Sequence, residues 1–280
     1  MEKGIVKAVL ETSNNILLEV YGDLLKPGVS QVGQAIGTLL GYGNTILMPL
    51  ALKNEKSKIV IESNLNKYRH KLENVPQENI QSVVPEIGVP ILEKLMYVSD
   101  DTLVELYTEL LAKASDKEQC ESTHPSFVNI INNLSPKEVL LIEKINSASL
   151  AFVNTNIIVG SSIHPLEQIL ELALMEDTYD KNYTAYISNL AGLGLIEVTL
   201  EQHITDSQIY QRLEDLIRRV YTSAPSVFEQ HKIAASLKSG NIEFNRGLIR
   251  ISNFGTLFLT ACTQTTNKSY LINIFHRLNS

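Results

Sequence analysis

HPSFVNIINNLSPKEVLLIEKI, residues 124–145, predicts two helices that meet at a sharp corner. The apolar residues of the first helix recur at helical spacing, and they are Phe127, Ile130, Ile131 and Leu134. In the second helix, Ser135 takes the N-cap position, Pro136 the first helical position, and Glu138 the position that completes a capping box. Because proline is favoured in the first turn of a helix and disfavoured in its interior, we place a domain boundary between residues 134 and 135.

Upstream of this corner the pattern is helical. SDDTLVELYTELLAKAS, residues 99–115, has apolar residues at i, i+3, i+4, i+7, i+8 and i+11, with Ser99 or Asp100 placed to cap its start. Residues 53–73 predict a solvated amphipathic helix, and residues 75–90, which hold three prolines, predict a connecting segment. We therefore expect an all-helical domain over residues 1–134.

Downstream of the corner the pattern changes. Two helix-like stretches, Pro165–Glu176 and Tyr183–Leu193, are followed by two short strand-like runs, 194–200 and Leu248–Ile251, and then by an apolar helix. This order is typical of a winged-helix domain, here with an insertion at about 205–245 that carries its own amphipathic helix. The predicted fold class is mainly α with a small β component. A helical N-terminal domain precedes a winged-helix-like α+β domain over residues 135–280.

A glycine-rich run, VGQAIGTLLGYG at residues 32–43, lies within a stretch from 27 to 52 that has no charged residue. At about 100° per residue its apolar side chains share one arc, with Gln31 and Gln34 opposite. Glutamines facing lipid disfavour a membrane-spanning helix, so we predict an amphipathic helix that packs on a neighbouring helix. The alternative is reversible binding to a membrane surface through the same strip. In both cases the strip of small residues that lets the helix come close to a neighbouring helix or to the membrane consists of Gly33, Gly37 and Gly41.

Composition narrows the class of protein. The chain has 280 residues, a formal net charge of −7 and 44% hydrophobic residues, values typical of a folded acidic protein. The net charge opposes non-specific attraction of the whole molecule to nucleic acid or anionic lipid. Two widely separated cysteines, Cys120 and Cys262, and the lack of an export signal favour the cytoplasm, with attachment to the inner face of the membrane as the alternative.

No catalytic constellation stands out. The six histidines are scattered, and the chain holds no metalloprotease pair, phosphate-binding glycine loop or serine nucleophile elbow. Cys120 and His124 supply at most half of a metal site. We predict a protein that is not an enzyme, with no cofactor and no metal.

The distribution of basic and acidic residues tests whether the predicted winged helix could bind DNA. Residues 135–205 hold three Lys and Arg against nine Asp and Glu, whereas residues 206–280 hold nine against five. The helix expected in the recognition position, near 179–194, is therefore a poor phosphate-contacting surface. Ordinary surface ion pairs with acids such as Glu214 and Asp215 are the alternative for the basic residues. The candidate nucleic-acid contacts are Arg212, Arg218, Arg219, Lys232, Lys238, Arg246 and Arg250.

Taken in order, several segments resemble the Abi-alpha family of bacterial abortive-infection proteins. They are LLEVYGDLLKPGVSQVGQAIGTLLG, IQSVVPEIGVPILEKLMYVSDDTLVELYTELLAKAS, THPSFVNIINNLSPKE, GLIEV and a closing SNFG helix. The similarity runs from Leu17 to Cys262, and its most specific part is His124 to Glu138. The last helix begins with ISNFG where the family usually has LTPFG, which leaves the start of that helix open.

This resemblance implies a bacterial cytosolic protein of anti-phage defence, whose action makes the infected cell stop growing or die. It assigns no catalytic residues. We expect a protein that acts through contacts with a partner protein or phage component, with a membrane contact as a variant. Two alternatives stay open, namely a winged-helix DNA-binding regulator and an effector that perturbs membranes through the helix at residues 29–48. The oligomeric state is left open.

Overall fold

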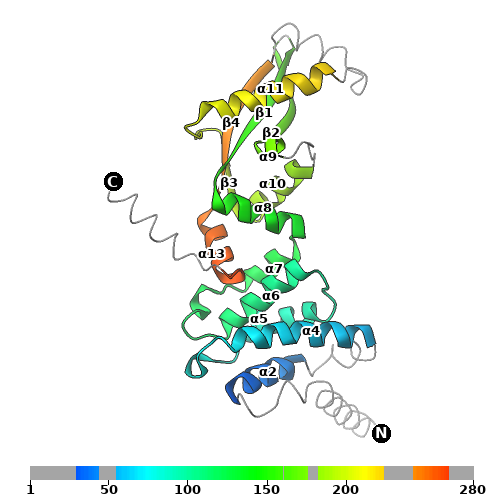
Figure 1. Ribbon diagram of the computed structural model, residues 1–280, viewed down its shortest axis with the longest axis vertical. Coiled ribbons are helices and arrows are strands. Elements are labelled where there is room, and N and C mark those ends of the chain that lie inside the picture. The colour runs from blue at the N-terminus through cyan, green and yellow to red at the C-terminus, as the bar shows by residue number, and fades with distance from the viewer. Residues whose placement is uncertain (1–29, 44–54, 160, 176–181, 224–241, 265–280) are drawn as a thin grey trace, which may run out of the picture. The chain divides into compact units, whose positions relative to one another are not determined.

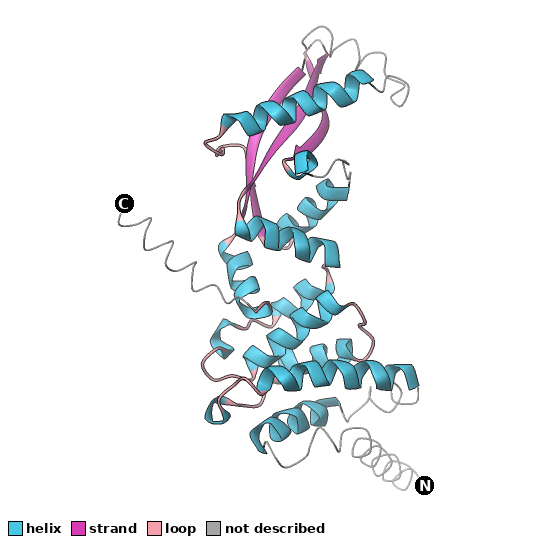
Figure 2. Cartoon of the chain, viewed as in Figure 1, coloured by secondary structure: helices cyan, strands magenta, loops and turns pink. Residues whose placement is uncertain are grey.

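The computed structural model describes residues 30–43, 55–159, 161–175, 182–223 and 242–264. These residues are mostly helical and contain one four-stranded antiparallel sheet (Figures 1 and 2). That content agrees with the predicted class of a mainly α protein with a small β component. The contacts within the chain form two compact units, Met1–Pro136 with Leu257–Ser280, and Lys137–Thr256. The winged-helix arrangement and the boundary between residues 134 and 135 stay predictions.

The described part of the first unit consists of helices, two of which are short 3₁₀ helices. They are α2 (Ser30–Gly43), α4 (Glu55–Leu72), η1 (Gln77–Asn79), α5 (Pro85–Leu95), α6 (Asp101–Ala114), η2 (Cys120–Ser122), α7 (Ser126–Asn132) and the second part of α13 (Asn253–Cys262). Fully buried aromatic rings anchor this core, and Phe127 of α7 meets Phe258 of α13 edge to face, with ring centroids 5.5 Å apart. The HPSF segment therefore contributes a core residue, Phe127, rather than an exposed one.

Local capping sets the start of α6, as the sequence predicts. The Asp100 carboxylate accepts hydrogen bonds from the N–H groups of Thr102 and Leu103, at 3.0 and 3.1 Å.

The prediction of a connecting segment over residues 75–90 is wrong at its end, because α5 begins at Pro85 and continues through Pro90. Proline costs nothing at the first helical position, and burial of the apolar face of α5 outweighs the hydrogen bond lost at Pro90.

The second unit combines helices with the sheet. Its elements are α8 (Pro136–Ser147), β1 (Leu150–Val159), β2 (Ser162–Leu170), α9 (Leu172–Met175), α10 (Asn182–Gly192), β3 (Ile196–Thr199), α11 (Ser207–Ser223), β4 (Ile242–Ile251) and the start of α13. The strands lie in the order β2-β1-β4-β3, and every neighbouring pair is antiparallel. Figure 1 shows α11 lying along one face of this sheet. Its Tyr210, Leu213 and Ile217 are buried against sheet residues that include Ala151, Val153, Ile157 and Ile169.

The sequence misassigned part of this unit. Residues 165–170, predicted as helix, belong to β2, and only Leu172–Met175 of the predicted stretch is described as helical. A short apolar run does not distinguish a helix from a buried strand. Here the antiparallel pairing with β1 makes residues 165–170 part of a strand. The predicted strand at Leu248–Ile251 is longer than expected, since β4 begins at Ile242 inside the expected insertion.

Gly194 ends α10 in a Schellman motif. Its φ of +75° lies in the left-handed region that favours glycine. The N–H of Leu195 donates to the Leu190 carbonyl at 3.0 Å, and the N–H of Gly194 donates to the Ala191 carbonyl at 2.9 Å. The reversal sends the chain directly from α10 into β3.

Ser252 caps the start of α13. Its hydroxyl oxygen accepts the N–H of Gly255 at 2.8 Å and donates to the carbonyl of Gly194 at 2.6 Å. Asn253 is the first residue of α13, at the position where the family usually has proline. The start of α13, which the sequence left open, is therefore fixed by the Ser252 cap.

Candidate functional site

Two of the predicted nucleic-acid contacts are bound to carboxylates. Arg246 Nε donates to Glu214 at 2.8 Å, and the Arg246 guanidinium lies 5.4 Å from the centroid of the Tyr210 ring. Arg250 pairs with Glu197 across β3 and β4 at 2.6 Å. These pairs agree with the surface ion-pair alternative. Lys232 and Lys238 lie outside the described residues.

The other three candidate arginines belong to α11 and share one cavity. Arg212, Arg218 and Arg219 are exposed, and they line a surface cavity of about 580 Å³ together with Ala173, Leu174, Asp215 and Leu216. The Arg218 guanidinium also stacks over the Phe244 ring, 4.8 Å from its centroid. We call this cavity, bounded by α9 and α11, the arginine cavity.

The helix before β3 does not supply the basic residues. The residues of α10, NYTAYISNLAG at 182–192, include no charged side chain. Within the described part of this unit, the exposed arginines lie on α11 and β4 and not on α10, the helix in the recognition position.

A second cavity, of about 550 Å³, lies beside α8. Its lining includes Lys137, Leu140, Leu141, Glu143, Lys144, Ser147, Leu172 and Tyr183. Leu140 is 55% exposed, which is high for a leucine on an amphipathic helix. This surface was not predicted from the sequence. Its signal is Leu140, an apolar residue between Lys137 and Lys144 that lies off the buried stripe of α8.

The glycine-rich helix α2 packs mainly on α5, with further contacts to α4. Its apolar arc is buried as the periodicity predicts, through Val32, Ala35, Ile36, Leu39 and Leu40, whereas Gln31 and Gln34 are exposed. Gly33 and Gly37 are half-buried at the margin of this face, and Gly41 lies in the last turn of α2. Among the described helices, none has the length and apolar character needed to cross a membrane.

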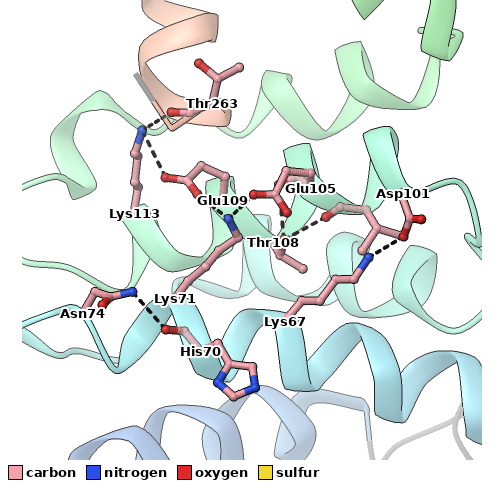
Figure 3. A network of polar contacts seen from close by, with 11 residues as sticks. Lys67, His70, Lys71, Asn74, Asp101, Glu105, Thr108, Glu109, Lys113 and Thr263 are labelled. Carbon is pink, nitrogen blue, oxygen red and sulfur yellow. Dashed lines mark hydrogen bonds and ion pairs between the residues drawn. The ribbon is translucent and has the colours of Figure 1, made fainter. Parts of the chain in front are cut away.

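A charge network in the first unit, in which the side chains of Lys71, Glu109 and Lys113 are largely buried, was not visible in the sequence. Figure 3 shows Lys71 of α4 directed toward Glu105 and Glu109 of α6, with its Nζ 2.7 Å from Glu109 Oε2. Lys113 lies 3.4 Å from Glu109 Oε1 and donates to the carbonyls of Thr260 and Thr263 at the end of α13. Burial lowers the pKa of Lys71, but the hydrogen bonds and charges of Glu105 and Glu109 outweigh it, and the pKa is raised. Lys71 therefore keeps its positive charge at neutral pH. The network joins α4, α6 and the end of α13.

The half metal site considered in the sequence is not assembled further in the described part of the chain. Cys120 Sγ donates to the Lys117 carbonyl at 3.5 Å, and His124 Nδ1 accepts the N–H of Ser126 at 3.1 Å. Over these residues, no group of three or more His, Cys, Asp or Glu side chains is placed to hold a metal ion.

The family model for abortive infection alpha matches residues 59–262. The chain belongs to this family. The match starts within α4 and ends with α13, so it includes both cavities and the charge network but not α2. Abi-alpha membership connects the protein with abortive infection. No curated protein and no solved structure matches this chain.

Proposed function

We propose that this protein defends a bacterial cell against phage by docking onto a protein partner, without catalysing a reaction itself. The family match over residues 59–262 is the observation that carries the defence role. In this proposal the protein acts in the cytosol, and its engagement with the partner makes the infected cell stop growing or die. The partner is a host protein or a phage component.

The cavity beside α8 is the docking surface that we propose, and its lining consists of Lys137, Leu140, Leu141, Glu143, Lys144, Ser147, Leu172 and Tyr183. Lys137 and Lys144 are two helical turns apart on α8, and Leu140 lies between them. The occupant that fits this chemistry is an amphipathic helix of the partner, with apolar residues for the leucines and acidic residues for the flanking lysines. Docking of the partner would remove the exposed side chain of Leu140 from water.

The test is phage protection in a bacterial host that expresses the full chain, measured at low and at high phage-to-cell ratio over a varied phage panel. We expect rescue of the culture at low ratio and collapse at high ratio, as in suicide-type defence. Leu140→Glu should reduce protection by about tenfold or more, because it places a carboxylate in the apolar centre of the docking surface.

Ile59→Glu is the matched control, since Ile59 is 66% exposed on α4, away from α8 in the chain. It should retain protection at an equal level of folded protein, checked by thermal melting. Absence of protection against every phage would overturn the defence role. Equal protection by wild type and Leu140→Glu would overturn the docking surface while leaving the defence role intact.

A winged-helix DNA-binding regulator is the second candidate. The partial strand order β1-β4-β3, with α10 leading directly into β3, supports a winged-helix core in which α11 lies within the wing. We place this candidate second because α10 carries no charged residue and fold alone does not decide function. Its test is retention on duplex DNA at low salt, which Arg218→Ala with Arg219→Ala should weaken.

A further inference from the structure

We propose that the sheet of the second unit binds a second copy of this chain through the face that points away from α11. Side chains alternate between the two faces of a strand, and Val153 and Ile157 of β1 are buried with residues of α11. Asn154, Asn156 and Ile158 therefore lie on the opposite face. This face is separate from the docking surface on α8, and the inference does not rest on the proposed function.

A row of side-chain amides crosses three strands on this face. Asn154 of β1 is paired with Gln168 of β2 on one side and with Asn245 of β4 on the other. All three residues are half-buried, and in the described part of the chain their side-chain amides form no hydrogen bond. Asn156 follows along β1, where it pairs with Glu243. We call Asn154, Asn156, Gln168 and Asn245 the amide face.

Strand stability does not account for these residues. β1 and β4 are the inner strands of the sheet, where β-branched and aromatic residues are favoured and asparagine is depleted. Toward one end of the same face, Phe152 and Leu170 are buried. Toward the other end, the directly paired Ile158 and Ile163 are 37% and 61% exposed. The outer half of the face therefore combines polar groups with exposed apolar side chains, as protein interfaces do.

Charge selects the occupant of the amide face. Each copy of the chain has a formal net charge of −7, so two copies repel each other on average. The amide face is uncharged, and the carboxylate at its margin, that of Glu243, lies 3.5 Å from the amide of Asn156. A side-chain amide both donates and accepts hydrogen bonds, so a row of amides bonds to its own copy across a twofold axis without bringing like charges together. A strongly charged partner would find no row of opposite charges here.

The contact uses the face of the sheet and not its edge. β2 is an edge strand, but Pro165 within it has no N–H to donate, and the register of β1 and β2 shifts between Thr155 and Asn156. Proline and irregular register both oppose the addition of a further strand at an edge. The sheets of the two copies would therefore stack face to face.

The experiment is sedimentation velocity of the full-length protein over a concentration series up to about 500 μM. The amide face with Ile158 and Ile163 is smaller than the roughly 20–30 residues that a standard interface uses on each side, so we expect a dimer with a dissociation constant on the order of 10–100 μM. Asn154→Lys and Asn154→Glu should each raise this constant by about tenfold or more, because the middle of the row meets its own copy. An equimolar mixture of the two variants should dimerise at least as tightly as wild type, since opposite charges then meet.

Ile163→Glu, at a more exposed position, should also weaken the dimer by about tenfold, which keeps the test valid if the Asn154 variants fold poorly. Leu200→Glu is the matched control, because Leu200 is 48% exposed and follows β3, at the other edge of the sheet. It should change the dissociation constant by less than about twofold. Thermal melting checks that each variant is folded.

The proposal is overturned if the protein is monomeric over the whole series, or if the variants of the face dimerise like wild type. It is also overturned if Leu200→Glu weakens the dimer as much as they do, or if the mixture of folded Asn154 variants does not dimerise. These results are independent of the phage assay.

Discussion

A Cβ atom on Gly255 would lie 2.0 Å from the carbonyl oxygen of Leu195. The first turn of α13 therefore packs directly on the backbone where α10 passes into β3. Gly255 is also the residue whose N–H is capped by Ser252. The glycine of the ISNFG segment is required by this close approach, since any side chain would push α13 away from the Leu195 backbone.

Gly255→Ala should consequently lower the free energy of unfolding by about 2 to 4 kcal/mol, because a backbone carbonyl cannot move aside as a flexible side chain can. Chemical denaturation followed by circular dichroism measures the change. Gly192→Ala is the control, because a Cβ there would meet nothing within 4 Å. An equal loss of stability in both variants would contradict the steric explanation.

Lys71→Met should destabilise the first unit by about 2 to 4 kcal/mol, because it leaves Glu109, whose side chain is 9% exposed, with only the more distant Lys113. The double variant Lys71→Met with Glu109→Leu should recover part of this loss. A double-mutant cycle from urea unfolding gives the coupling free energy. Additive effects of the two substitutions would show that the pair is not coupled.

Glu171 predicts a pH dependence of stability. Its carboxylate is 7% exposed and accepts the Ala151 N–H at 2.8 Å. Burial raises the pKa of Glu171, an effect that the Ala151 hydrogen bond partly offsets. The folded state then binds the proton more tightly than the unfolded state, so this residue reduces stability as pH rises above the unfolded pKa of about 4.3.

Glu171→Gln removes the titration but keeps an acceptor oxygen for Ala151. Its melting temperature should exceed that of wild type at neutral pH, and the difference should shrink as the pH falls toward about 4. Glu201→Gln, at an exposed carboxylate, serves as the comparison and should show no such trend. A difference that grows on acidification would reverse the assigned sign.

The burial of the apolar face of α2 predicts no binding to membranes by the folded protein. Val32, Ile36 and Leu39 are each at most 1% exposed and lie against neighbouring helices. Purified full-length protein should stay unbound in flotation with vesicles of anionic phospholipid and should cause no dye leakage. Flotation that is lost on Gln31→Glu with Gln34→Glu, two exposed positions of α2, would instead favour the membrane-perturbing effector.

The sequence predicted elements whose signals are local. The cap at Asp100, the proline start of α8 and the amphipathic stripe of α11 each depend on residues within a few turns of one another. The family resemblance also rested on local segments, and those from Ile80 to Cys262 lie within the match over residues 59–262, whereas the segment at 17–41 lies outside it. The buried position of Tyr210 on α11 was not predicted from the sequence, because its hydroxyl bonds to the Gly247 carbonyl, 37 positions away.

What the sequence by itself determined is the mainly helical class, most helix positions and the family, because helix periodicity and capping are short-range properties of the chain. Tertiary structure alone decided that residues 165–170 are a strand, since pairing with β1 supplies their hydrogen bonds. It also decided which distant residues meet: Arg246 and Glu214 are 32 positions apart, and residues of α9 and α11 line one cavity. A sequence tells which residues carry charge. Packing sets the distances between these residues, and those distances determine which of them form ion pairs or line a cavity.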